Sequence, residues 1–257
     1  MYKRQQINLN WLYTDSRHRL WVVGRKGRIF RYDTARDRFV MTYKLSDLQD
    51  DVTSGTVNCT YMDSNDRIWL CHGDSIVRYD TRAGTTDRID SPAPDDITAI
   101  TQTDSTNFFI GTSNGLLQTI EKEGVLETVA GTYTDSIRIP VSELYFHEDS
   151  KQLFIGTFKE GIIAYGMNTT STIIADGPLQ NVAIKRITPF GKRQLLVATG
   201  GRGVYKIDVD SLSARPYITA DYSNYNGMNG NNINDIYVDG DGRIWICLLY
   251  TSPSPRD

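Results

Sequence analysis

A short motif recurs along the chain, and it restricts the fold more than any other feature. In its three clearest copies a tryptophan follows an aspartate by six residues: Asp15 and Trp21, Asp63 and Trp69, and Asp239 and Trp245. Three weaker copies place Phe109, Phe154 and Leu196 at the tryptophan position. These six anchors are spaced 40 to 49 residues apart. An internal repeat of that length indicates successive copies of one small supersecondary unit.

Other positions keep the same phase as the anchors. Apolar pairs precede most anchors by nine and twelve residues, as Ile100 and Ile97 precede Phe109. A glycine or serine follows most anchors by six or seven residues and opens another apolar run, as Gly115 does before Leu116. Each repeat therefore contains short β-rich runs separated by polar turns, which is typical of hairpins.

Four-stranded units of this length predict an all-β fold, a β-propeller of four-stranded antiparallel blades. The repeats suffice for about five and a half blades, so an incomplete propeller fragment is expected. The first strand of each blade should lie nearest the axis. The anchors expected on second strands, buried between blades, are Trp21, Trp69, Phe109, Phe154 and Trp245.

The charge balance argues against nucleic acid as a partner. The 257 residues carry 28 Lys and Arg against 31 Asp and Glu, a net charge of −3. Nucleic-acid binders normally show a basic patch or stripe. No apolar run approaches the roughly 20 residues that span a bilayer. The sequence therefore predicts neither nucleic-acid nor membrane contact for this fragment.

Both ends of the sequence can be read as a sequencing adaptor. Residues 1–5 can be encoded as GTG TAT AAG AGA CAG, and the reverse complement of that string, read one base later, encodes residues 247–251. We therefore expect residues 1–5 and 247–257 to be adaptor-like artefacts. On this interpretation residues 6–246 are a partial β-propeller domain, and the gene continues beyond both ends.

The repeats resemble the two-component regulator propeller repeat, whose pattern is Asp-x-x-Gly-x-x-Trp-Ile/Leu followed by Gly-Leu-x-x-Tyr-Asp. The segments that carry the likeness are 239–245, 109–116, 154–157, 30–33, 77–80 and the inter-blade loop 226–233. Together the repeats cover essentially all of residues 6–246. Cys71 departs from the pattern, because the family usually has glycine after Trp-Leu.

The resemblance implies a sensor. Such repeats form the periplasmic sensor region of hybrid two-component histidine kinases, which detect oligosaccharides from polysaccharide breakdown. It therefore implies an oligosaccharide ligand, a periplasmic location and a parent protein that is a membrane-anchored homodimer. This fragment would not be an enzyme, although the full-length parent would be a histidine kinase.

Two other classes of function are alternatives. A propeller enzyme of the lyase or glycosidase type predicts clustered His, Arg or carboxylates around the channel mouth, and the sequence shows no such cluster. A propeller scaffold for protein interaction predicts recurring Gly-His and Trp-Asp pairs or a Gly-Gly motif, and neither recurs. The fold alone does not decide between these classes.

No catalytic site, metal site or cofactor is predicted. His18 and His147 are expected in solvated turns on one side of the disc and His72 on the other, so they cannot converge on a metal. No Ser or Thr has a plausible His–Asp partner pair. Cys59 and Cys71 should face each other across one hairpin, either as two buried thiols or as a disulfide.

A ligand surface is predicted on one face of the propeller. The turns between second and third strands emerge there together with the inter-blade loops. The ligand-binding candidates are Arg25, Lys26, His72, Asp74, Asn114, Lys159, Glu160, Arg202, Tyr222, Tyr225 and Asn226. Aromatic rings can pack on the C–H faces of a sugar while amides and charges bond its hydroxyls. Alternatively, Tyr222 and Tyr225 merely anchor a long loop.

Overall fold

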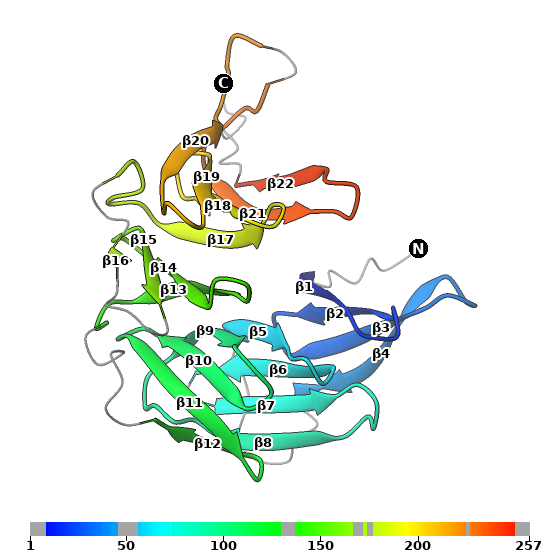
Figure 1. The fold of residues 1–257 in the computed structure, drawn as a ribbon. Helices are drawn as coiled ribbons and strands as arrows, with labels where there is room; N and C mark the ends of the chain where they lie inside the picture. Colours follow the sequence, from blue (N-terminus) through cyan, green and yellow to red (C-terminus); the bar gives the residue numbers. More distant parts are fainter. Residues whose placement is uncertain are drawn as a thin grey trace, which may run out of the picture. The chain divides into compact units, whose positions relative to one another are not determined.

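The computed structural model describes residues 9–45, 56–73, 75–129, 137–166, 172–173, 177–224 and 227–249. Within these ranges the regular structure is entirely β, with five four-stranded sheets and one two-stranded sheet. Each sheet is antiparallel and its strands lie in sequence order, as Figure 1 shows. The predicted all-β fold of four-stranded propeller blades, incomplete in the sixth, is thereby confirmed. We number the sheets blades 1 to 6 along the chain.

Blades 1 to 3 belong to one compact unit and blades 4 to 6 to another. Unit 1 contains the described residues up to 129, apart from 114–116, and unit 2 contains the others. Blade 1 consists of β1 (Leu9–Thr14), β2 (Leu20–Gly24), β3 (Arg28–Asp33) and β4 (Arg38–Lys44). Blade 2 consists of β5 (Cys59–Met62), β6 (Arg67–His72), β7 (Ser75–Asp80) and β8 (Thr86–Asp90). Blade 3 consists of β9 (Ile97–Gln102), β10 (Asn107–Thr112), β11 (Leu116–Lys122) and β12 (Val125–Thr128).

Unit 2 repeats the same order of strands. Blade 4 consists of β13 (Val141–His147), β14 (Gln152–Thr157), β15 (Ile162–Gly166) and β16 (Thr172–Ile173). Blade 5 consists of β17 (Ile184–Pro189), β18 (Gln194–Thr199), β19 (Val204–Asp208) and β20 (Ala214–Ile218). Blade 6 has two described strands, β21 (Ile233–Val238) and β22 (Ile244–Leu248). No helix long and apolar enough to cross a bilayer occurs among the described residues.

The anchor residues pack between neighbouring blades of unit 1. Trp21 is 1% exposed and meets Tyr79 of blade 2 edge-on, with ring centroids 5.9 Å apart. Trp69 is fully buried against Phe108 of blade 3, with centroids 4.8 Å apart. Phe109 on β10 is also fully buried. The repeat thus places a large ring at the same register in β2 and β6, where each ring fills the gap to the next blade.

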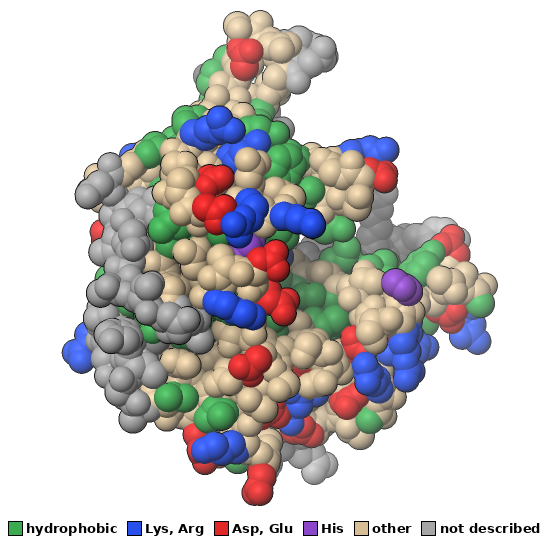
Figure 2. All heavy atoms as spheres, viewed as in Figure 1, with side chains coloured by type: hydrophobic (Ala, Val, Ile, Leu, Met, Phe, Trp, Pro, Cys, Tyr) green, Lys and Arg blue, Asp and Glu red, His purple; other side chains and the backbone are tan. Residues whose placement is uncertain are grey.

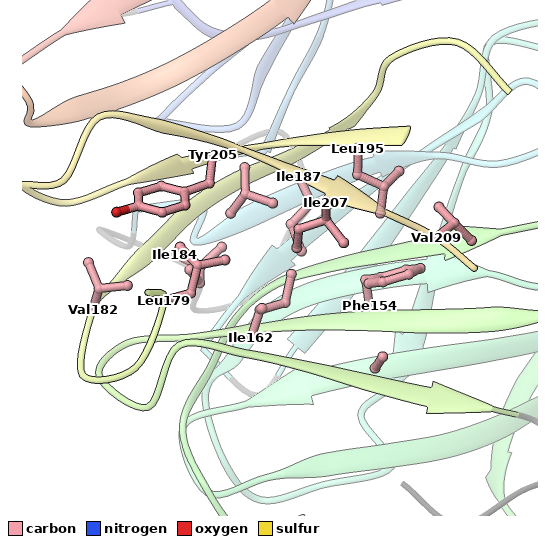
Figure 3. Close-up of a cluster of buried hydrophobic side chains, with 12 residues drawn as sticks. Phe154, Ile162, Leu179, Val182, Ile184, Ile187, Leu195, Tyr205, Ile207 and Val209 are labelled. Carbon is pink, nitrogen blue, oxygen red and sulfur yellow. The ribbon is translucent and has the colours of Figure 1, made fainter. Parts of the chain in front are cut away.

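Unit 2 buries an aliphatic core between blades 4 and 5. Phe154 and Ile162 of blade 4 point toward Ile187, Leu195 and Ile207 of blade 5, as Figure 3 shows. These side chains are at most 3% exposed. Phe154 thus occupies the second-strand position and the buried environment that the repeat predicts.

The sixth anchor differs from this prediction. Trp245 is 61% exposed, although β22 pairs with β21 in the expected register. Alternate residues of β22 point to opposite sides, and Ile244 and Ile246 pack toward blade 5. Trp245 therefore points to the other side, where no described sheet covers it. The expectation that Trp245 is buried between blades was wrong for this reason.

The expected domain boundaries remain predictions. Residues 1–5 and 250–257 lie outside the described residues, whereas β22 continues in paired register through Cys247 and Leu248.

Candidate functional site

Unit 1 places three of the predicted ligand-binding residues at the same ends of its strands. Arg25 and Lys26 are exposed in the β2–β3 turn, and His72 is half-buried at the end of β6. Asp74 lies outside the described residues. The backbone N–H of Val57 donates to the Arg25 carbonyl at 2.7 Å, so the turn contacts the segment that enters the next blade. Turns and inter-blade segments therefore meet on one face, as the propeller pattern predicts.

Unit 2 carries the remaining candidates on the equivalent turns. Asn114 is exposed in the β10–β11 turn, Lys159 and Glu160 are exposed in the β14–β15 turn, and Arg202 is exposed in the β18–β19 turn. Tyr222, in the loop between β20 and β21, is 78% exposed. Tyr225 and Asn226 of the same loop lie outside the described residues.

The β20–β21 loop is fastened to the turn that carries Arg202. The backbone N–H groups of Gly201 and Gly203 donate to the Asn231 carbonyl at 3.1 and 2.8 Å. The Asn231 side-chain oxygen accepts from the N–H of Ala220 at 2.7 Å. Asn231 thereby joins the two ends of the loop to the flanks of Arg202, so the structure brings these two candidate elements together.

Gly203 is required for this close approach. Its φ of +77° lies in the left-handed region, and an added Cβ would stand 2.5 Å from the Ile218 carbonyl oxygen and 3.1 Å from the Asn231 side-chain oxygen. Any larger residue would therefore push the loop away from the turn.

Hydrogen bonds of its own backbone and polar side chains shape the tip of the loop. The Asp221 carboxylate accepts from the N–H and the hydroxyl of Ser223 at 3.0 and 2.6 Å, and these bonds lower the pKa of Asp221. The N–H of Asp221 donates to the Met228 carbonyl at 3.1 Å. Tyr222 sits beside this turn and makes no hydrogen bond with any described residue. Its ring is therefore held out in solvent by a closed loop.

Sequence reasoning missed a row of charges on the first strands of unit 2. Arg186 of β17 lies 3.4 Å from the Glu143 carboxylate of β13 and 3.4 Å from the Asp235 carboxylate of β21. The equivalent first-strand positions of blades 2 and 3 hold the buried Cys59 and Ala99. The replacement of small apolar residues by charges in three successive repeats is the signal that could have revealed this row.

Glu143 is the carboxyl group of this row whose pKa is raised. Its side chain is 18% exposed, and burial together with the nearby Asp235 carboxylate raises the pKa of Glu143 to about 7, while Arg186 opposes the shift. A carboxyl group in this setting exchanges a proton near neutrality. It can therefore act as a hydrogen-bond donor or acceptor at the start of the first strands.

β-Bulges recur at the start of the first strands, next to this row. The pairing register of β1, β9, β13, β17 and β21 with the second strand skips one residue at the same place. The skipped residues are Asn10, Thr98, Ser142, Lys185 and Asn234. All are polar; Asn10, Lys185 and Asn234 are exposed, and Thr98 and Ser142 are partly exposed. A bulge releases its extra residue from the ladder and re-aims the side chain, so these positions lie at the same strand ends as the candidate turns. The Ser142 hydroxyl, for example, donates to the Ile184 carbonyl of the next blade at 2.8 Å.

The structure changes the interpretation of one histidine. His147 is 6% exposed, and its ring nitrogens contact the Ser150 hydroxyl at 2.9 Å and the Lys192 carbonyl at 3.0 Å. It is therefore a buried contact between blades 4 and 5, not the solvated turn residue that the sequence predicts. His18 is exposed in the β1–β2 turn. Among the described residues no group of three or more His, Cys, Asp or Glu could hold a metal ion.

Cys59 and Cys71 are direct partners across β5 and β6, as the hairpin predicts. Both are buried free thiols in this structure.

Comparison with known proteins supports the repeat assignment. The family described as "Two component regulator propeller" matches residues 227–248, which contain the β20–β21 loop end, β21 and β22. No curated protein matches the chain. Two solved structures of the extracellular domain of BT4673 from B. thetaiotaomicron are similar, each with a TM-score of 0.60 and 18% sequence identity. One describes its parent as a one component system and the other as a hybrid two component system. Each match covers 95% of this chain and 37% of the solved chain.

Proposed function

We propose that this chain, which carries a two-component regulator propeller repeat, is a ligand-sensing part of a larger signalling protein anchored in a membrane. The repeat match and the shared propeller fold support this proposal. The chain spans little more than a third of the length of the solved structures it matches, so the parent's histidine kinase activity, periplasmic location and dimeric state are parts of the proposal.

The proposed ligand is an oligosaccharide bound in unit 2, beside the β18–β19 turn and the β20–β21 loop. The observation that carries this proposal is the 78% exposed ring of Tyr222 on a loop fastened through Asn231 to the Arg202 turn. An exposed tyrosine ring offers a flat surface for the C–H face of a sugar. The guanidinium of Arg202 and the bulge side chains of Lys185 and Asn234 offer charged and amide donors for hydroxyl groups.

The function we propose is binding, not catalysis. Arg202 donates to the Pro178 carbonyl at 2.8 Å, which fixes its side chain against the loop preceding blade 5. A preorganised donor next to an exposed ring suits recognition of a polar ligand, because little side-chain freedom is lost on binding.

The proposal is tested on the 257-residue chain with an array of oligosaccharides from plant and animal polysaccharides, followed by calorimetry on those that bind. Tyr222→Ala and Arg202→Gln should each weaken binding about tenfold or more, the loss expected when a binding anchor is truncated. Neither change should lower the melting temperature appreciably, because both side chains are exposed. Tyr237→Ala is the matched control, since Tyr237 is 62% exposed on β21 and lies outside the loop.

The proposed site would be wrong if both variants bound the same sugars as strongly as the unmodified chain. The proposed oligosaccharide ligand would be wrong if no member of the array bound.

A further inference from the structure

Two arginines of blade 2 grip a carboxylate supplied by blade 3. Arg67 donates to both oxygens of Glu121, at 3.1 and 2.9 Å, and Arg78 donates to the same carboxylate. Both guanidinium groups also lie over the ring of Trp69, 5.7 and 5.3 Å from its centroid. A paired fork of this kind is a strong and geometrically specific carboxylate site.

Blade 1 carries the same two arginines in the same register. Arg31 pairs with Trp21 across β2 and β3, as Arg78 pairs with Trp69 across β6 and β7. Residues directly opposite each other in antiparallel strands project to the same side of the sheet. Arg19 precedes Trp21 by two residues, as Arg67 precedes Trp69. The Arg19 guanidinium lies 5.3 Å from the centroid of the Trp21 ring, and the Arg67 guanidinium lies 5.7 Å from that of Trp69.

Blade 1 keeps one of the blade 2 carboxylates and lacks the other two. Arg19 bonds Asp15 at 2.7 Å, as Arg67 bonds Asp63 at 2.6 Å, but nothing in blade 1 corresponds to Glu121 or Asp87 among the described residues. Arg78 also bonds Asp87 at 2.7 Å, but the residue paired with Arg31 at that position is Val40. Arg19 reaches the following blade at Thr81, where it donates to the backbone carbonyl at 3.2 Å. Arg31 has no hydrogen-bond or ion-pair partner among the residues that the structure describes.

A buried hydroxyl group lies on the residue that Arg19 contacts, and a cavity is lined by Arg19 and Arg31. The hydroxyl oxygen of Thr81 is buried without a hydrogen-bond partner among the described residues. A cavity of about 420 Å³ has both arginines in its wall, and its lining includes Arg17, His18, Arg19, Arg31, Tyr32 and Thr34. Asp33 also borders the cavity, but its carboxylate is already bound to Arg36 at 3.0 Å. Figure 2 shows Lys or Arg side chains interspersed with Asp or Glu over the β1–β4 part of the molecule.

We propose that Arg19 and Arg31 bind the carboxylate group of a small acidic ligand, of which a hexuronate sugar is the chemistry that fits best. In blade 1 the carboxylate of the ligand takes the place that the Glu121 carboxylate has between the two arginines of blade 2. Arg17 and the Thr34 hydroxyl stand at the cavity wall to bond ring hydroxyls. The cavity lies at the opposite strand ends from the β2–β3 turn, so this proposal does not depend on the oligosaccharide site proposed above.

The test copies the blade 2 arrangement into blade 1. Calorimetry with sodium glucuronate should show binding to the unmodified 257-residue chain, and neutral glucose should bind at least about tenfold more weakly, since it lacks the charged group. Thr81→Glu should supply an internal carboxylate from blade 2 and abolish glucuronate binding. Val40→Asp should do the same from β4, in case the buried Thr81 position does not accommodate glutamate.

Direct changes to the clamp complete the experiment. Arg31→Gln should weaken glucuronate binding about tenfold or more, and Arg31→Lys should restore little of it, because lysine lacks the planar fork. Arg38→Gln removes an exposed positive charge from the same blade and should leave binding unchanged. Acetate competing as strongly as glucuronate would place recognition in the carboxylate alone, which still supports the clamp.

The proposal is overturned if glucuronate does not bind the unmodified chain. It is equally overturned if Arg31→Gln and both carboxylate-supplying variants bind glucuronate with unchanged affinity while remaining folded.

Discussion

An aspartate and the tryptophan six residues later make the same hydrogen bond in three blades, but in two different surroundings. The indole N–H donates to Asp15 and Asp63 at 2.8 Å and to Asp239 at 3.0 Å. In each turn the other carboxylate oxygen accepts the backbone N–H groups two and four residues on. The motif is thus a turn-and-ring clip, and burial decides how much stability each copy contributes.

The first prediction compares two copies of this clip. Asp63→Ala should lower the free energy of unfolding by about 3 kcal/mol or more, because it leaves a buried indole N–H without its partner and removes one of the two carboxylates that bind Arg67. Asp239→Ala removes the same contacts beside the exposed Trp245 and should cost much less. Urea unfolding of the two variants checks the difference, and equal losses would contradict the burial argument.

Asp66 predicts how acid affects the contact between blades 1 and 2. Burial disfavours its charge, yet hydrogen bonds from Ser16, at 2.8 and 2.5 Å, and from Arg82, at 2.7 Å, lower the pKa of Asp66 to about 2. An unfolded aspartate has a pKa of 3.8, so between these values the unfolded state binds more protons. The stabilisation is therefore present above about pH 4 and lost as the pH falls through 2.

Asp66→Asn should remove that dependence. The stability difference between the unmodified chain and Asp66→Asn should be largest above pH 4 and should shrink toward pH 2. Urea unfolding at several pH values between 2 and 5 measures it. A difference that stays constant over this range would show that Asp66 titrates normally.

Glu143, on the first strand of blade 4, predicts the opposite dependence of stability on pH. Glu143 has a pKa of about 7 in the folded chain, raised by burial, against an ordinary value of 4.5. Between these values the folded state binds more protons, so this group reduces stability as the pH rises from 4.5 to 7. Glu143→Gln cannot ionise, so its stability relative to the unmodified chain should increase over this interval. At pH 8 its melting temperature should be higher than that of the unmodified chain by roughly 3 °C or more.

Melting curves at pH 5 and pH 8 give that comparison. Glu148→Gln is a suitable control, because Glu148 is exposed in the β13–β14 turn. A Glu143→Gln difference that does not grow between the two pH values would rule out a raised pKa.

Strand order and second-strand register could be predicted because they follow from a period visible in the sequence. Trp21, Trp69 and Phe154 occupy the buried positions that the repeat assigns to them. The bulges could not be predicted in this way, because an extra residue such as Ser142 only shifts the alternation by one, and a shifted copy looks like a weak copy. The environment of Trp245 could not be predicted either, since its burial depends on a neighbouring sheet and not on its own repeat.

The candidate site was predictable only in part. Propeller topology indicates which turns share a face, and Arg202 and the Tyr222 loop do meet there. The Glu143–Arg186–Asp235 row and the open Arg19–Arg31 clamp depend on comparisons between blades in three dimensions. The sequence alone does not show whether an arginine has an ion-pair partner in the folded chain.

Each unit of the molecule is built from contacts between a blade and its neighbours. Trp245 and Tyr237, 61% and 62% exposed, lie on a side of blade 6 that no described sheet covers. Exposed aromatic side chains grouped on a sheet promote association. We predict that the chain self-associates as its concentration rises, and that Tyr237→Ser with Trp245→Ser reduces this association. Light scattering over a concentration series measures it, with Phe39→Ser, at 41% exposure on β4, as the control.

The bulges place side chains outside the β-ladder, where they can contact a ligand without belonging to the core of the blade. Asn10, Thr98, Ser142, Lys185 and Asn234 are inserted beyond the ladder, so none belongs to a hydrophobic core. Their chemistry already ranges from amide to hydroxyl to ammonium within one chain. Mutation at the exposed positions Lys185 and Asn234 can therefore explore new recognition properties with little effect on folding, whereas Ser142 also joins two blades through its bond to the Ile184 carbonyl. Each duplicated repeat provides a further position for such innovation.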